Sequence, residues 1–465
     1  MRRYRIGRIE GRWENLIPPI QLEISGKGEI VDPVTKDDDS PEENGSPMYR
    51  HRCTGSGTLD SAASGVSSNG DDSMAHLDAV TREKINLDLE TYPALDAATQ
   101  DAIVAKYRHL YGRIVAEGLF ECNYSAYGIE LCRYSVLFGL MLLFLHWGWY
   151  VTSAVFMGIF WHQMSFSAHD AGHIGITHNY QVDSVLGIVI ADFIGGMSMG
   201  WWKRNHNIHH IVTNFPEHDP DIEYLPFLAV SHRFLAGLRS SYYDRMMEYD
   251  TVAKFLVGFQ KYLYYPLLTF GRFNLYVLSW AYLLGGQAPC KGPSWWHWYL
   301  ELAGQVFYWI WYGYGVLGSI PTIRGRILFF LISHMVVAPL HVQLTLSHFA
   351  MSTADLGPQE SFPQKMLRTT MDVDCPPWLD FFHGGLQFQV IHHLFPRVPR
   401  HNLRRVQKLV REFCVEVDIP YALYGFVDSN KQVVGSLAEV SRQAAILAKC
   451  QQVMMAESGK GVNGH

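Results

Sequence analysis

The strongest constraint in this sequence is residues 134–168, which contain no Asp, Glu, Lys or Arg. A bilayer-spanning helix needs roughly 17 to 25 mostly apolar residues, and backbone inside hydrocarbon must satisfy its own hydrogen bonds. The stretch is too long for one comfortable span, and a bend fits at residues 146–149. We therefore predict a helical hairpin, each arm near the short end of that length range.

A second apolar pair is expected at residues 303–322 and 327–354, separated by a turn at 323–326. Residues 182–202 and 252–286 carry scattered charge, and we interpret them as interfacial or re-entrant helices. The fold class predicted is an all-α integral membrane protein with about four transmembrane helices in two hairpins, interfacial helices and a cytosolic histidine-rich cap. Residues 97–119 have helical periodicity and should lie on the membrane surface or against the body of the protein.

Composition narrows the function. A net charge of -6 gives no basic excess of the kind that nucleic-acid binding requires. The seven cysteines are scattered and form no CxxC pair, which argues against a disulfide framework or a zinc ribbon. The chain has 22 histidines, so the position of these metal-binding side chains decides the interpretation.

Two histidine clusters follow predicted apolar segments. His169 and His173 are spaced i, i+4, which places both imidazoles on one helix face. This pair alone is weak evidence, because ordinary interfacial histidines would give the same spacing. His206, His209 and His210 place three imidazoles within five residues, and the adjacent pair should diverge toward two metal ions. A histidine-rich polar loop is a poorer explanation of this second cluster.

The third cluster is Gln389, His392 and His393, in which the adjacent histidines again diverge. Gln389 could supply an amide oxygen or hold a water, or it could only neighbour the ligands. An additional ligand is expected from the preceding span, and we favour His348 over His341. Nearby carboxylates could orient ligand imidazoles, although a solvated-loop role competes for each of them: Asp170, Asp192, Asp219 and Asp221.

An even number of crossings would bring all three clusters to one membrane face, where they can form one metal centre. Imidazole suits iron, zinc or copper, so the ligand type does not name the metal. An all-histidine site in a lipid-facing body points to oxidation of an unactivated CH2 group, which zinc cannot perform because it is redox-inert. We therefore expect two iron ions, with O2 as co-substrate. Basic residues flank the clusters and make this face cytosolic by the positive-inside rule: Lys203, Arg204, Lys365, Arg368, Arg397, Arg400, Arg404 and Arg405.

In order, the motifs HDAGH (169–173), HNIHH (206–210) and QVIHH (389–393) resemble the front-end branch of membrane fatty acyl desaturases. The flanking WWK (201–203) and LFPR (394–397) strengthen the resemblance, which covers roughly residues 95–425. Residues 4–11 and 18–20 resemble the linker that follows cytochrome b5 in fungal sphingolipid Δ8-desaturases. This resemblance implies residues 1–94 as a linker, residues 95–425 as the desaturase domain, and 426–465 as a C-terminal tail. Within the linker, residues from 32 to about 80 are rich in Asp, Ser, Gly and Pro, and they should be disordered because they have too little apolar surface to offset the entropy of ordering.

The resemblance also implies a function. It predicts a multi-pass enzyme of the endoplasmic reticulum that desaturates the long-chain base of ceramide or glucosylceramide. Electrons would come from cytochrome b5 and its NADH-dependent reductase. The family's His-Pro-Gly-Gly haem motif does not occur here, so haem is not expected in this chain. Either the start has been lost, which we favour, or a separate cytochrome b5 delivers the electrons.

Three other functions compete with this one. A front-end acyl-lipid desaturase or a lipid hydroxylase would use the same scaffold. A non-catalytic membrane receptor that holds zinc is more remote, because the histidines exceed the four or so ligands that one structural zinc needs.

Overall fold

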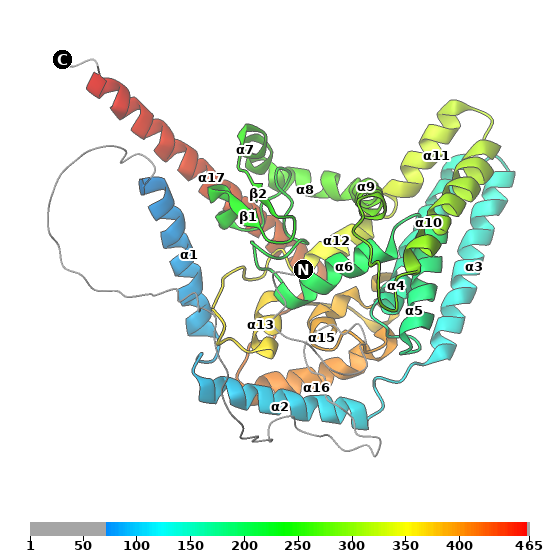
Figure 1. The fold of residues 1–465 in the computed structure, drawn as a ribbon, viewed down its shortest axis with the longest axis horizontal. Coiled ribbons are helices and arrows are strands. Elements are labelled where there is room, and N and C mark those ends of the chain that lie inside the picture. Colours follow the sequence, from blue (N-terminus) through cyan, green and yellow to red (C-terminus); the bar gives the residue numbers. More distant parts are fainter. Residues whose placement is uncertain (1–70, 463–465) are drawn as a thin grey trace, which may run out of the picture.

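The computed structural model describes residues 71–462, which form mainly α-helices (Figure 1). The only strands in this range make two small two-stranded sheets. In one, β1 (Leu238–Ser240) runs antiparallel to β2 (Arg245–Met247), and in the other β3 (Asp372–Asp374) runs parallel to β4 (Leu423–Gly425). The all-α class predicted from the sequence is confirmed in this coarse form.

The first apolar stretch forms the predicted helical hairpin, but each arm has 23 residues and is longer than predicted. Its arms are α3 (Tyr124–His146) and α4 (Tyr150–Gly172), and the chain reverses at Gly148, whose φ of 75° is favourable for glycine. Polar pairs join the arms, including Ser153 Oγ donating to the Met141 carbonyl at 2.7 Å. Helix α3 faces outward along most of its length, whereas the second half of α4 is buried.

The second apolar pair differs from the prediction at its boundaries. It consists of α10 (His297–Tyr308), the π-helix η4 (Trp309–Leu317), α11 (Ile323–Met335) and α12 (Ala338–Leu346). The turn predicted at 323–326 is wrong, because Thr322 caps α11 by accepting a hydrogen bond from the Gly325 N–H at 3.1 Å. The second arm, predicted over 327–354, instead runs from Ile323 to Leu346, with a break in its helix at residues 336–337.

By length and composition, two helices in the described part could cross a membrane, Tyr124–His146 and Ile323–Leu346. A third is possible if a bent pair counts as one span: Tyr180–Ile194 and Met199–Val212 meet at 118°. This pair contains α5 (Tyr180–Ile188), the π-helix η2 (Val189–Ile194) and α6 (Met199–Val212). The predicted total of four spans therefore remains a prediction.

The remaining helices lie around this membrane unit. Residues 252–286, predicted as interfacial or re-entrant helices, form three short helices: α7 (Thr251–Gly258), α8 (Gln260–Thr269) and α9 (Gly271–Leu284). The 3-10 helix η3 (His232–Ala236) precedes β1 and packs in a separate core. The region that holds the third histidine cluster is built mostly from short segments: α13 (Phe362–Thr369), η5 (Pro377–Leu379), α14 (Asp380–His383), η6 (Leu386–Phe388), α15 (Gln389–Leu394), η7 (Arg400–Asn402) and α16 (Leu403–Glu416).

Helix α2 (Ala97–Ala116) packs against this region, which decides between the two placements predicted for it. It buries Ile103, Tyr107 and Ile114 in a core shared with α15 and α16. The Tyr107 hydroxyl donates to the Leu394 carbonyl at 2.6 Å. Helix α2 therefore lies against the enzyme body and supports the helix that carries His392 and His393.

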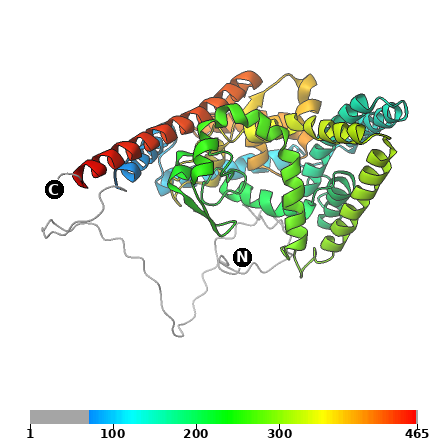
Figure 2. The ribbon, with the colours of Figure 1, turned by 90° about the horizontal axis from the view of Figure 1, so that it is seen from above.

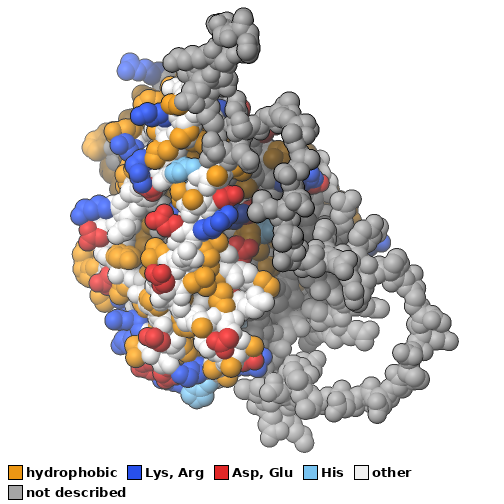
Figure 3. Space-filling view, turned by 90° about the vertical axis from the view of Figure 1, so that its left-hand side faces the viewer, with side chains coloured by type: hydrophobic (Ala, Val, Ile, Leu, Met, Phe, Trp, Pro, Cys, Tyr) orange, Lys and Arg blue, Asp and Glu red, His pale blue; other side chains and the backbone are white. Residues whose placement is uncertain are grey.

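Helices α1 (Asp71–Thr91) and α17 (Phe426–Val462) run close together (Figure 2). The disorder predicted for residues 32–80 is wrong for 71–80, which are helical, and the rest of that segment lies outside the described residues. Leu77 is buried in a core with Val433 and Leu437 of α17, and His76 bonds Gln443 at 2.9 Å. This burial offsets the entropy of ordering α1. The surface on the left-hand side of Figure 1 mixes acidic, basic and hydrophobic side chains, as Figure 3 shows.

Candidate metal centre

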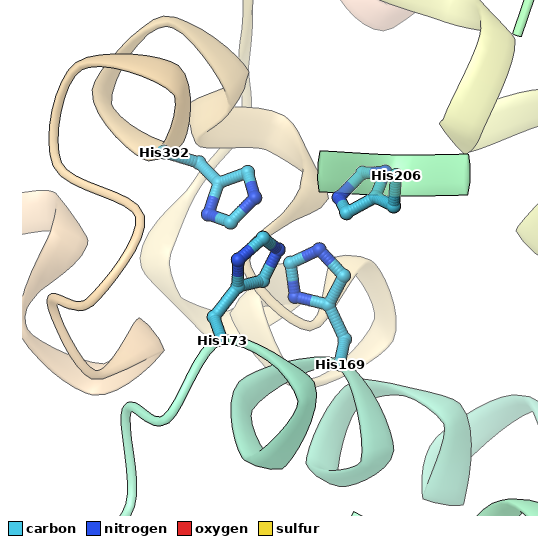
Figure 4. Close-up of side chains that lie close together, drawn as sticks. All are labelled: His169, His173, His206 and His392. Atoms are coloured by element: carbon cyan, nitrogen blue, oxygen red, sulfur yellow. The ribbon is translucent and has the colours of Figure 1, made fainter. Parts of the chain in front are cut away.

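Four histidines from three helices face a common point (Figure 4). His169 lies in the last turn of α4 and His173 caps that helix, while His206 comes from α6 and His392 from α15. One ring nitrogen of each lies within 4.8 Å of the others. We name these four residues the first histidine group.

A second histidine group consists of His209, His348 and His393, whose nitrogens also lie within 4.8 Å of one another. His348 comes from the turn that follows α12, so the structure brings it to the site and leaves His341 outside both groups. His210 lies between the groups. Its Nε2 is 3.1 Å from that of His206, and its ring centroid is 4.2 Å from that of His393.

The donor atoms of these histidines fit a metal ion. Within the described part of the chain, several buried ring nitrogens have no hydrogen-bond partner, including both nitrogens of His173 and the Nε2 atoms of His392 and His393. Buried polar atoms normally have a partner, so such a concentration calls for one. Burial, together with neighbouring imidazoles, lowers the pKa of His348, His392 and His393 well below the usual value. These rings are therefore neutral, as metal ligation requires.

Two aspartates behind α6 hold the second cluster of the sequence. The Asp219 carboxylate accepts a hydrogen bond from His209 Nδ1 at 2.9 Å, which turns Nε2 toward the second histidine group. Asp219 is itself fixed by the Asn214 N–H at 2.7 Å. Asp221 lies 3.7 Å from His206 Nδ1. Burial would raise the pKa of Asp221, but the imidazoles of His209 and His206 lower it to about 2.

Comparison with known proteins identifies the family. Residues 145–425 match the family model for fatty acid desaturases. The chain belongs to the fatty acid desaturase family. The resemblance inferred from the three histidine motifs is thereby confirmed, and with it the class of oxidoreductases to which this family belongs.

Curated relatives cover nearly the whole chain. The chain is 59% identical to the Delta 8-(E)-sphingolipid desaturase of Emericella nidulans, over 99% of its own length and 86% of that protein. It is 47% identical to the protein of the same name from Komagataella phaffii, over 99% and 85% of the two chains. The Acyl-lipid (9-3)-desaturase of Borago officinalis is 34% identical, over 74% and 76%.

The other two predicted carboxylates of this desaturase have different surroundings. Asp170 lies 3.9 Å from His169 Nδ1 and accepts hydrogen bonds from Arg400 and the Tyr127 hydroxyl. Asp192 instead accepts from the Met199 N–H at 3.1 Å, so it caps the start of α6. Asp192 is therefore not placed to orient a ligand imidazole.

Trp202 belongs to the WWK motif that precedes the second histidine cluster, and the motif alone assigns it no role. Its ring stacks on His206, with centroids 4.5 Å apart, and also contacts His169 and His173. A Cβ on Gly172 would lie 2.1 Å from the Trp202 ring. The glycine of the first motif thus leaves room for the indole, which covers the first histidine group.

Four further histidines near the three motifs stay outside both groups. His178 bonds the Phe120 carbonyl at 2.7 Å, and His218 bonds Ser241 Oγ at 2.6 Å. His162 and His383 also lie outside. Gln389 is buried at the start of α15.

A cavity of about 540 Å³ adjoins the desaturase centre. His169, His206 and His348 line one part of it, together with Gln389. Most other lining residues are apolar or aromatic, as expected for a site that holds a hydrocarbon chain.

Proposed function

We propose that this protein is an O2-dependent di-iron desaturase that introduces a double bond at Δ8 of a sphingolipid long-chain base. The substrate would be ceramide or glucosylceramide. The observation that carries the proposal is the 59% identity, over 99% of this chain, to a protein named Delta 8-(E)-sphingolipid desaturase. A front-end acyl-lipid desaturase is less favoured, because the borage relative is 34% identical over 74% of the chain.

The two histidine groups would each hold one iron, and His210 lies between them within reach of both. Gln389 lines the cavity beside the centre, where its side chain would supply an amide oxygen ligand or support a water. When bound, the irons would make O2 reactive enough to remove two hydrogens from adjacent methylenes. The O2, together with two electrons and two protons, would leave as water. The unpartnered buried nitrogens of His173, His392 and His393 support this assignment.

The protein itself would orient and enclose the reaction. Asp219 holds the His209 ring in one tautomer through its Nδ1–H. The apolar cavity walls would exclude water and keep the hydrocarbon chain beside the histidines. Electrons would come from cytochrome b5 and its NADH-dependent reductase, on the cytosolic face of the endoplasmic reticulum. Residues 95–425 would form the catalytic domain, with 1–94 as a linker and 426–465 as a C-terminal extension.

Expression in a yeast that lacks sphingolipid desaturation tests the proposal. The chain is expressed alone and fused to a cytochrome b5 domain, and long-chain bases and fatty acids are analysed by mass spectrometry. A Δ8-unsaturated base is expected, and it should disappear in His209→Ala but persist in His218→Ala, whose ring lies outside both histidine groups. Unsaturated fatty acids would indicate an acyl-lipid desaturase, and hydroxylated products a hydroxylase.

Metal analysis of the purified protein provides an independent test. Two irons per chain are expected, and His209→Ala should lower that content. One tightly held zinc and no iron would instead favour the receptor that holds zinc structurally.

A further inference from the structure

Arg272 is a buried cation in the wall of the cavity. Its side chain, on α9, is 1% exposed and lines the same cavity as His169 and His206. Among the described residues, no carboxylate pairs with it. A buried charge without a counter-charge is costly, and in membrane proteins such residues commonly mark a functional site.

The contacts of Arg272 fix its position without neutralising it. Nη2 donates to the Gly195 carbonyl at 2.6 Å, Nε donates to the Tyr276 hydroxyl at 3.1 Å, and the guanidinium lies 4.1 Å from the Trp161 ring centroid. Tyr276 in turn bonds Tyr308 at 2.8 Å. These partners are neutral, and a guanidinium has more N–H donors than they use. Arg272 is therefore oriented and still able to bind an oxygen atom in the cavity.

The distance from Arg272 to the first histidine group can be judged along α4. Trp161, which stacks on Arg272, precedes His169 by eight residues of this helix, so the two lie about 12 Å apart along its axis. An extended chain advances about 1.2 Å per bond, which places C1 of a long-chain base about 9 Å from its C8–C9 bond. The C1–O bond and one hydrogen bond add roughly 4 Å, so the sum is about 13 Å, which is close to that rise along α4.

The cavity is also open near Arg272. Phe270, which is 50% exposed, and the exposed Asn274 both line it and belong to the same stretch of chain as Arg272. Apolar side chains such as Met197 and Leu340 line the cavity as well. This distribution of side chains would suit a lipid whose polar head lies at the opening and whose hydrocarbon chain leads to the histidines.

We propose that Arg272 donates a hydrogen bond to the oxygen on C1 of the sphingolipid long-chain base, and so determines which carbons reach the histidine groups. The inference rests on the proposed function, because it takes a long-chain base as the substrate. Arg272 would be a residue that sets specificity and position. It would take no part in the chemistry.

The test compares two lipids on the full chain, supplied with cytochrome b5 and reductase: a ceramide and its 1-deoxy analogue, which lacks only the C1 oxygen. The wild type should prefer the ceramide in kcat/KM by about 10- to 100-fold, the size expected for a hydrogen bond to a charged group. Arg272→Met should lose this preference because its kcat/KM on ceramide falls while that on the 1-deoxy analogue does not. The double bonds that this variant introduces should also spread to positions next to Δ8.

Arg326→Met is the matched control. Arg326 also lies in an apolar helix and donates to a backbone carbonyl, that of Ile320 at 2.7 Å, but it does not line the cavity. This variant should keep both the preference and the Δ8 position. Arg272→Lys keeps the charge without the planar fork and should retain part of the preference. Thermal unfolding and iron content show whether each variant folds.

The outcomes separate the two proposals. A wild type that makes no Δ8 base contradicts the proposed function. A wild type that makes it, together with folded Arg272 variants that keep the preference and the position, overturns the role of Arg272. If neither Arg272 variant folds, the wild type decides the question, because equal kcat/KM on the two lipids would refute recognition of the C1 oxygen.

Discussion

Replacing Arg400 by methionine should strongly destabilise the protein. Arg400 is 7% exposed and donates to the carboxylates of Glu130 on α3 and Asp170 on α4. It also donates to the Phe166 carbonyl at 3.0 Å. One cation thus joins both arms of the first hairpin to the chain that follows the third histidine cluster.

The magnitude follows from what the substitution leaves behind. Removing one partner of a buried ion pair costs about 3–5 kcal/mol, because the remaining charge is uncompensated. Two carboxylates lose their guanidinium, but Glu130 keeps the His401 ring at 3.0 Å and Asp170 keeps the Tyr127 hydroxyl, so we expect a cost within that range and not above it. Asp170 directly follows His169, so iron content should fall as well.

The free energy of unfolding is measured by denaturant titration in detergent micelles. Arg113→Met is the matched control: Arg113 pairs with Glu412 at 2.9 Å, but the two side chains are 36% and 56% exposed. Exposed pairs of this kind contribute about 0–1 kcal/mol. Adding Glu130→Gln to Arg400→Met should recover part of the loss. If Arg400→Met unfolds no more easily than Arg113→Met, the reasoning is refuted.

Three further predictions follow from the same geometry. Asp219→Asn should lower iron affinity about 10- to 100-fold by releasing the His209 ring, and unchanged affinity in a metal titration would contradict this. Gly158→Ala should cost about 1–3 kcal/mol, because its Cβ would lie 2.7 Å from the Ser333 carbonyl oxygen. Gly112→Ala, with nothing within 4 Å, should gain about 0.5–1 kcal/mol, and equal melting temperatures for the two variants would exclude this account. Chelating the metal should lower the melting temperature, since it leaves buried imidazole nitrogens unpartnered; an unchanged value would argue against a metal bound to the folded state.

Local sequence signals predicted the parts of the fold that depend on neighbouring residues. The absence of charge over residues 134–168 and the bend at Gly148 gave the first hairpin with its turn. The boundary of α11 was misplaced, although Thr322 is a good N-cap residue and was visible in the sequence. Helix α1 was missed for another reason. Its buried Leu77 packs against α17, more than 300 residues away, and composition alone does not contain that contact.

In the candidate site, too, local sequence signals predicted some features and missed those that depend on distant residues. The spacing of the histidine motifs predicted which residues gather, and the structure brings His348 to them. The motif spacing did not predict the Arg400 contacts, because Glu130 lies 270 residues from Arg400 in the sequence. Trp202 also lacked an assigned role, since only the folded chain shows its indole over His206.

The adjacent histidines explain why the two groups form one centre. Neighbouring residues on a helix point about 100° apart, so two adjacent imidazoles cannot serve the same metal position. In α15, His392 belongs to the first histidine group and the adjacent His393 to the second. In α6 the division falls between residues three apart, because His206 belongs to the first group and His209 to the second. Each of these helices therefore contributes to both groups at once. A shift of either helix would alter both groups together, which makes the packing of α2 and α16 behind α15 part of what holds the centre.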